Sequence, residues 1–100
     1  MLIIRLLAHI PPEKQKEFAD AIALAESVAG SAPDARIVMH DTEDHSLFCW
    51  QADWASRDRL VQFIRSDGFR ALRGAIQVLG TLKSLVLAES QPFPEVGSES

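Results

Sequence analysis

The sequence has 100 residues, of which 47% are hydrophobic and 24% are charged. It is long enough for one hydrophobic core and too short for two. Its formal net charge of -4 argues against a broad surface for nucleic acid or an anionic membrane. Cys49 is the single cysteine, which excludes an internal disulfide framework and a multi-cysteine zinc site.

The first half of the chain predicts a strand, a helix and a second strand. Residues 2–10 are rich in Leu and Ile and stop at Pro11 and Pro12, which is typical of a strand with a firm end. From Pro12, apolar residues recur at helical spacing until Gly30, a natural terminator. Residues 35–40 read as the second strand, and the polar turn DTEDHS follows them.

The second half predicts a third strand, a two-part helix and a last strand. Residues 47–54 pair with the second strand through the short turn. Ser56 and Ser66 are placed to cap two helical segments that the sequence SDG separates, and Gly80 ends the second of them. Residues 82–89 form the last strand, and we expect residues 91–100 to be a mobile tail.

This order predicts an α+β domain over residues 1–90 with the ferredoxin-like βαββαβ arrangement, a four-stranded antiparallel sheet with both helices on one face. In the first strand, one row of side chains is wholly apolar and the other is mixed. In the last strand we group Leu82 with Ser84 and Val86, opposite Lys83 and Leu85. Neither row is cleanly polar, so the second sheet face predicts a partner, most simply a second copy.

The start I-x-R-L-x-A-x-I-x-P-x-K-x-x-x-F, Ile3 to Phe18, and the passage WASRDRLVQFIRSDGF, Trp54 to Phe69, resemble the antibiotic biosynthesis monooxygenase-like family. The resemblance covers roughly residues 2–90. It implies a homodimeric α+β barrel in which each subunit holds a cavity between its sheet and its helices. The family includes cofactor-independent oxygenases of quinols and polycyclic aromatics, haem-degrading enzymes, and members with no assigned reaction.

Some positions of this chain match the residues typical of the family, and others do not. Trp54 matches the tryptophan that closes the third strand in the family. Ala52 stands where the family often has a carboxylate, Phe63 where haem-degrading members have their histidine ligand, and Leu6 where they have an asparagine. The resemblance therefore argues against haem degradation, and we expect no cofactor and no bound metal.

Side chains alternate across a sheet, so Phe48, Trp50, Ala52 and Trp54 share one face. We call Phe48, Trp50 and Trp54 the aromatic row. The resemblance places it on the cavity side, with Leu6 on the first strand and Phe63 and Phe69 on the second helix. One interpretation is a flat slot for a planar aromatic substrate. The other, which is commoner for such rows, is that the rings fill the core.

The remaining polar candidates are histidines and arginines. The segment HDTEDH, residues 40–45, offers metal-ligand types, but a solvated turn is the favoured interpretation. His40 and His9, each near the end of a strand, are candidate catalytic acids or bases. The arginines from Arg57 to Arg73 read as a solvated helix face with local ion pairs, not as a nucleic-acid surface.

Two hypotheses follow. The first is a cofactor-independent monooxygenase acting on a small phenol or quinol-like substrate. The second is a non-catalytic dimeric module that binds a small hydrophobic molecule or a protein partner. Since Arg5 interrupts the apolar start and no apolar run approaches the ~18 residues of a membrane span, we expect a cytoplasmic protein.

Overall fold

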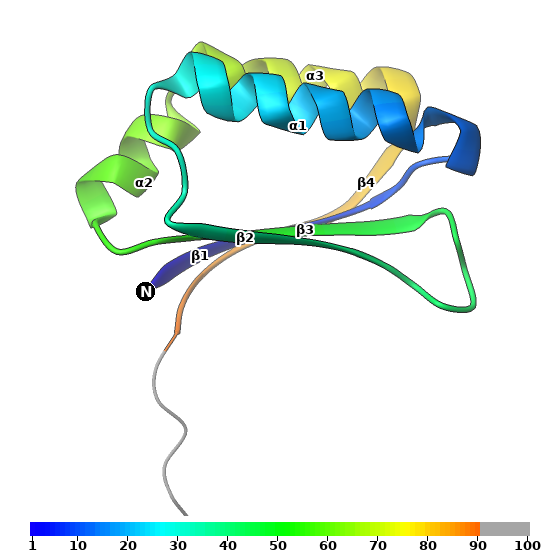
Figure 1. The fold of residues 1–100 in the computed structure, drawn as a ribbon, viewed down its shortest axis with the longest axis horizontal. Helices are drawn as coiled ribbons and strands as arrows, with labels where there is room; N and C mark the ends of the chain where they lie inside the picture. Colours follow the sequence, from blue (N-terminus) through cyan, green and yellow to red (C-terminus); the bar gives the residue numbers. More distant parts are fainter. Residues whose placement is uncertain (91–100) are drawn as a thin grey trace, which may run out of the picture.

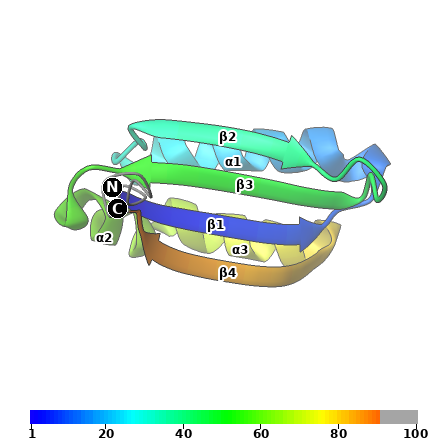
Figure 2. The same ribbon diagram turned by 90° about the horizontal axis from the view of Figure 1, so that it is seen from below.

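The structure is a computed structural model, and it describes residues 1–90. Four strands form one antiparallel sheet in the order β2-β3-β1-β4, and the helices lie together on one face of it, as Figures 1 and 2 show. The strands are β1 (Leu2–His9), β2 (Ala35–His40), β3 (Leu47–Trp54) and β4 (Thr81–Glu89). The predicted ferredoxin-like architecture is confirmed. The expected mobile tail lies outside the described residues.

Apart from the start of α1, the helices begin and end where the sequence places its caps. A 3-10 turn, Pro12–Lys14, leads into α1 (Gln15–Ala29), so the proline starts this turn and not the α-helix itself. Gly30 ends α1 with a φ of 67°, a left-handed conformation that glycine adopts at little cost. Ser56 caps α2 (Arg57–Ile64) and Ser66 caps α3 (Asp67–Leu79), each accepting a backbone N–H in the first turn.

The core lies between the helices and the inner face of the central strands. The inner row of β1, Ile4, Leu6 and Ala8, is fully buried, and the corresponding row of β3 is buried beside it. In contrast, every residue of β2 is exposed, because that strand forms the edge of the sheet. The helices therefore cover the middle of the inner face and leave its β2 edge accessible.

One grouping in β4 was wrong. Leu7 pairs with Ser84 but Ala8 pairs with Leu82, so the register shifts at this point and Lys83 is the extra residue of a bulge. The bulge moves Leu82 to the same side as Leu85 and Leu87, away from Ser84 and Val86. Strict alternation along β4 fails here because a bulge inserts one residue without a partner.

Gly68 of α3 lies directly against α1. A Cβ at this position would stand 2.4 Å from the carbonyl oxygen of Ala25, so the Gly68→Ala variant must push the two helices apart. We expect the free energy of unfolding to fall by about 1–3 kcal/mol.

Gly74, on the same helix, is a matched control because nothing lies within 4 Å of its would-be Cβ. The Gly74→Ala variant should gain about 0.5–1 kcal/mol from helix propensity. Urea unfolding measures both changes, and an equal effect of the two substitutions would contradict this account of the helix contact.

Candidate functional site

The aromatic row lies next to Phe63 of α2 and Phe69 of α3, the two rings expected opposite it. The ring of Phe63 lies 4.9 Å from that of Trp54 and 6.0 Å from that of Trp50, between centroids. Phe69 lies 5.5 Å from Phe63, and Leu6 pairs with Trp50 across the sheet. All six predicted substrate-binding residues are thus neighbours in one cluster.

This cluster is closed. Leu6, Trp50, Trp54 and Phe63 have 0% exposed surface, and Phe48 and Phe69 have 1% and 5%. A side chain with no accessible surface adjoins no space that would admit even a water molecule. In this structure the rings are core packing, and Phe63 lies near both indoles.

The two tryptophans differ in one respect. The indole N–H of Trp54 donates to the carbonyl oxygen of Ser31 at 3.3 Å. The indole N–H of Trp50 is buried and finds no acceptor among residues 1–90. A buried donor that lacks a partner costs free energy, so Trp50 is held in place by packing alone.

Two of the surface pockets lie beside β2. A pocket of about 490 Å³, here called the His40 pocket, is lined by Pro12, Gln15, His40, Asp41, Thr42 and His45. It lies at the end of β2 and the start of α1. A second pocket of about 450 Å³ lies at the opposite ends of these elements and includes Glu26, Asp34 and Arg36. Both pockets open along the sheet edge that the helices leave uncovered.

His40 connects the His40 pocket to the aromatic row. It pairs with Phe48 across the sheet, and its ring lies edge-on to that of Phe48 at 5.3 Å and 87°. Phe48 in turn lies edge-on to Phe18 of α1 at 4.9 Å. The exposed imidazole therefore lies against the buried ring of Phe48 and lines the His40 pocket.

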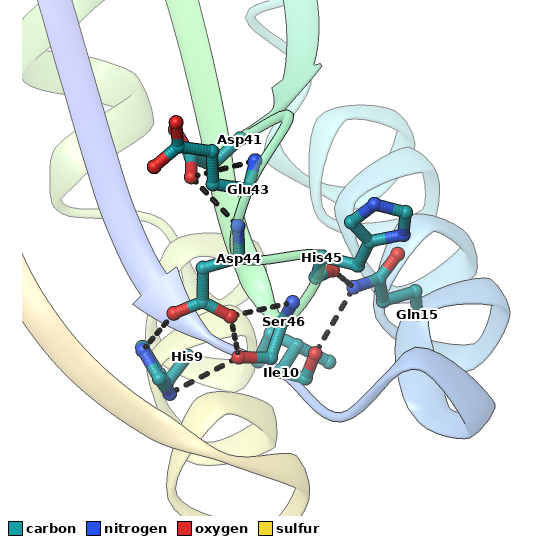
Figure 3. A network of polar contacts seen from close by, with 8 residues as sticks. All are labelled: His9, Ile10, Gln15, Asp41, Glu43, Asp44, His45 and Ser46. Carbon is teal, nitrogen blue, oxygen red and sulfur yellow. Dashed lines mark hydrogen bonds and ion pairs between the residues drawn. The ribbon is translucent and has the colours of Figure 1, made fainter.

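His9 lies elsewhere. It belongs to the outer row of β1, and its ring contacts Asp44 and Ser46 of the β2–β3 turn (Figure 3). It does not line the His40 pocket. The two predicted histidines are therefore not brought together, and only His40 faces a pocket on the helix side of the sheet.

The walls of the His40 pocket are fixed by polar contacts of the turn, which Figure 3 shows. One carboxylate oxygen of Asp41 accepts the backbone N–H groups of Glu43 and Asp44, at 3.2 and 2.8 Å. The side-chain amide of Gln15 donates to the carbonyl oxygens of Ile10 and His45. Gln15 was missed by sequence reasoning, because nothing in a helical pattern shows which polar residue reaches a distant turn.

Metal binding by the HDTEDH segment finds no geometric support. Within residues 1–90, no three His, Cys, Asp or Glu side chains converge as metal ligands would. Asp41 and Asp44 instead accept hydrogen bonds inside the turn. In the same part of the chain, no helix has the length and apolar character needed to cross a bilayer.

The second pocket is bordered by ion pairs. Arg36 pairs with Glu26, whose other carboxylate oxygen is buried and has no partner in the described part of the chain. Asp34 accepts the backbone N–H of Ala55 and an Arg59 guanidinium N–H, and these contacts, the first above all, lower the pKa of its carboxyl below the ordinary 3.8. Arg59 is thus a structural ion-pair partner, as the solvated-face interpretation predicts.

Comparisons with known proteins add to this geometry. No sequence profile of a known family matches the chain, and neither does any curated protein. Among solved structures, a variant of SnoaB, a cofactor-independent oxygenase from Streptomyces nogalater, matches with a TM-score of 0.72 and 18% identity, over 94% of this chain and 97% of its own.

Two further structures match over most of both chains. An antibiotic biosynthesis monooxygenase has a TM-score of 0.66 and 21% identity, over 92% of this chain and all of its own. A conserved protein from Methanosarcina mazei Go1 has a TM-score of 0.62 and 25% identity, over 88% and 90%. The chain therefore has the fold of solved antibiotic biosynthesis monooxygenases.

Proposed function

We propose that this chain is a cofactor-independent monooxygenase that acts on a small planar phenol or quinol-like molecule in the His40 pocket. The shared fold supports the reaction class. The observation that carries the proposal is the placement of His40, an exposed imidazole that lines the pocket and lies edge-on to Phe48. A planar ring entering there meets the imidazole of His40, which the buried ring of Phe48 supports from behind.

The proposed chemistry needs only a base and molecular oxygen. His40 takes the proton of the substrate hydroxyl, and the resulting anion passes one electron to O₂. The superoxide joins the substrate radical at a ring C–H carbon and forms a C–O bond. His40 returns its proton to the peroxide, which then loses water to leave a quinone. One oxygen atom of O₂ enters the product and the other leaves as water.

The aromatic row has a supporting role in this proposal. Phe48 is the member of the aromatic row that contacts His40 and so lies behind the pocket wall. The same buried cluster contains Trp50, Trp54, Phe63, Phe69 and Leu6. A rigid wall keeps the substrate hydroxyl within reach of His40, and such positioning is worth several kcal/mol in catalysis. A substrate that contacts the inner rings directly would require them to move.

Oxygen uptake with a panel of aromatics tests the function. The panel contains 1-naphthol and anthrone, each measured with and without protein. The proposal predicts that protein accelerates oxygen uptake and quinone formation for at least one of them. No acceleration with any, under conditions where the protein is folded, would sink the oxygenase proposal.

Because the closed aromatic cluster leaves no slot for a substrate among its rings, it argues for a second candidate without turnover, a non-catalytic module whose small hydrophobic ligand would bind outside this cluster. Binding without turnover distinguishes the two. Under this candidate, panel members raise the melting temperature or shift the NMR signals of His40 and Phe48, while oxygen uptake stays at the rate without protein.

We also propose that two copies pair through the outer face of the sheet. No helix of residues 1–90 covers this face (Figure 2). Ile37, Met39 and Val86 are 51%, 41% and 45% exposed on it, beside the half-buried Leu7 and Cys49. Exposed apolar rows of this kind mark interaction surfaces.

Light scattering in solution measures the assembly directly. We expect a mass of about twice the 11.0 kDa of one chain. Replacing Met39 with lysine on this face should yield the monomer, whereas Val78→Lys, on the exposed outer side of α3, should leave the dimer intact. A monomeric native protein would contradict the pairing.

A further inference from the structure

Three side chains close a ring of contacts between the end of β1 and the β2–β3 turn (Figure 3). His9 Nε2 lies 3.1 Å from Asp44 Oδ2, and Ser46 Oγ lies 2.6 Å from Asp44 Oδ1. Ser46 Oγ also lies 3.3 Å from His9 Nδ1. Each side chain therefore touches both of the others.

The number of protons that these contacts need determines the protonation state of His9. Each of the three contacts joins two nitrogen or oxygen atoms, so each needs one proton between its two atoms. Ser46 supplies one proton and the Asp44 carboxylate supplies none. A neutral imidazole carries one N–H, which leaves one contact without a proton. Only the imidazolium, with an N–H on both nitrogens, completes all three.

Asp44 stays charged across the range in which a histidine titrates. Hydrogen bonds from the Ser46 hydroxyl and backbone N–H, with a smaller contribution from His9, lower the pKa of the Asp44 carboxyl below 3.8. The Asp44 carboxylate is therefore ionised and available to His9 at all pH values above this lowered pKa. Acid would protonate Asp44 and break its contact with His9 only as the pH falls through that pKa.

Within residues 1–90, His9 makes no other ion pair. Across the sheet it pairs with Leu47 of β3 and Thr81 of β4, which are uncharged. Lys83 is the next charged residue along β4, and Arg5 of β1 is engaged with Gln51. The side chains of His9 and Asp44 are 41% and 47% exposed. Water therefore competes with their ion pair, and the stability that these contacts contribute is modest.

The ring is mechanically joined to the His40 pocket. The same turn that carries Asp44 and Ser46 also carries Asp41, Thr42 and His45, which line the pocket. The backbone of Ser46 is tied to β1 as well, since its carbonyl oxygen accepts the N–H of Ile10 at 2.7 Å. A change in the contacts among His9, Asp44 and Ser46 therefore acts on a wall of the His40 pocket.

We propose that His9 is a positioning residue that latches the β2–β3 turn to β1 when it is protonated. The latch holds one wall of the His40 pocket, and deprotonation loosens it. The latch is a property of the turn itself, and only its consequence for turnover rests on the proposed function. Stability of the turn is thus present at mildly acid pH and decreases as the pH rises.

Amide hydrogen exchange followed by NMR tests the latch. After correction for intrinsic exchange rates, protection of the Ser46 amide should fall about two- to fivefold between about pH 5 and pH 8. His9→Gln should show a flat profile over the same range. Ser46→Ala, which opens the ring but leaves the His9–Asp44 ion pair, should reduce the pH dependence without abolishing it.

His45→Gln is the matched control, because it removes a histidine of the same turn that is outside the ring and should keep the native profile. Equal pH dependence in the native protein and in His9→Gln would overturn the latch. This outcome is independent of turnover. Intact exchange behaviour without any oxygen uptake would overturn the proposed function and leave the latch standing.

Discussion

His40→Gln should lower kcat/KM with the best substrate of the panel by about 10²–10³-fold, the usual cost of removing a general base. Glutamine keeps the size and polarity of the side chain but cannot take the proton of a phenol. Because His40 is exposed at the end of an edge strand, the fold should tolerate the change. The measurement is initial-rate kinetics of quinone formation, with the urea midpoint of each variant determined alongside.

His45→Gln is the matched control for this prediction. His45 lines the same pocket, but unlike His40 it has no ring contact with Phe48. We expect its loss to change kcat/KM by less than tenfold. If His40→Gln retained full activity, His40 could not be the base, whatever the activity of the His45 variant.

Trp54→Ala should reduce the free energy of unfolding by about 3–5 kcal/mol. The side chain has no exposed surface, packs on Phe63 and donates its indole N–H to Ser31. A loss of this size is a large part of the 5–15 kcal/mol that stabilises a typical domain. Urea unfolding measures it, and a loss below about 1 kcal/mol would mean that the indole is not core packing.

A matched pair of milder substitutions separates packing from hydrogen bonding. Trp50→Phe and Trp54→Phe remove the same volume from the same row. Only Trp54 loses a hydrogen bond, whereas Trp50→Phe deletes a buried N–H that has no partner among the described residues. Trp54→Phe should therefore be the less stable variant by about 1 kcal/mol. The reverse order would show that the N–H of Trp50 has an acceptor.

The fold could be predicted because its signals are local. The alternation in residues 47–54, the glycine after α1 and the serines before α2 and α3 each determine nearby backbone, and the structure confirms them. The proximity of Trp54 and Phe63 could also be predicted, because the face of a sheet and the apolar stripe of a helix determine which rings can come together.

The site was less predictable because it depends on contacts between residues that are far apart in the sequence, and no local sequence pattern indicates such contacts. Whether the slot was open depended on how closely Phe63 approached Trp54, which is a matter of tertiary packing. The His40 pocket needs Gln15 to reach a turn thirty positions away, at His45. The bulge at Lys83 likewise has no signal in the alternation of β4.

The most direct test of the account is the fate of labelled oxygen. The native protein is supplied with ¹⁸O₂ and a phenol that has a free para ring position, such as 1-naphthol, and the quinone is analysed by mass spectrometry. We predict one ¹⁸O atom in each quinone formed, with a yield that falls in His40→Gln. Quinone without the label, or no quinone above the protein-free rate, would contradict the proposal that this chain is an oxygenase.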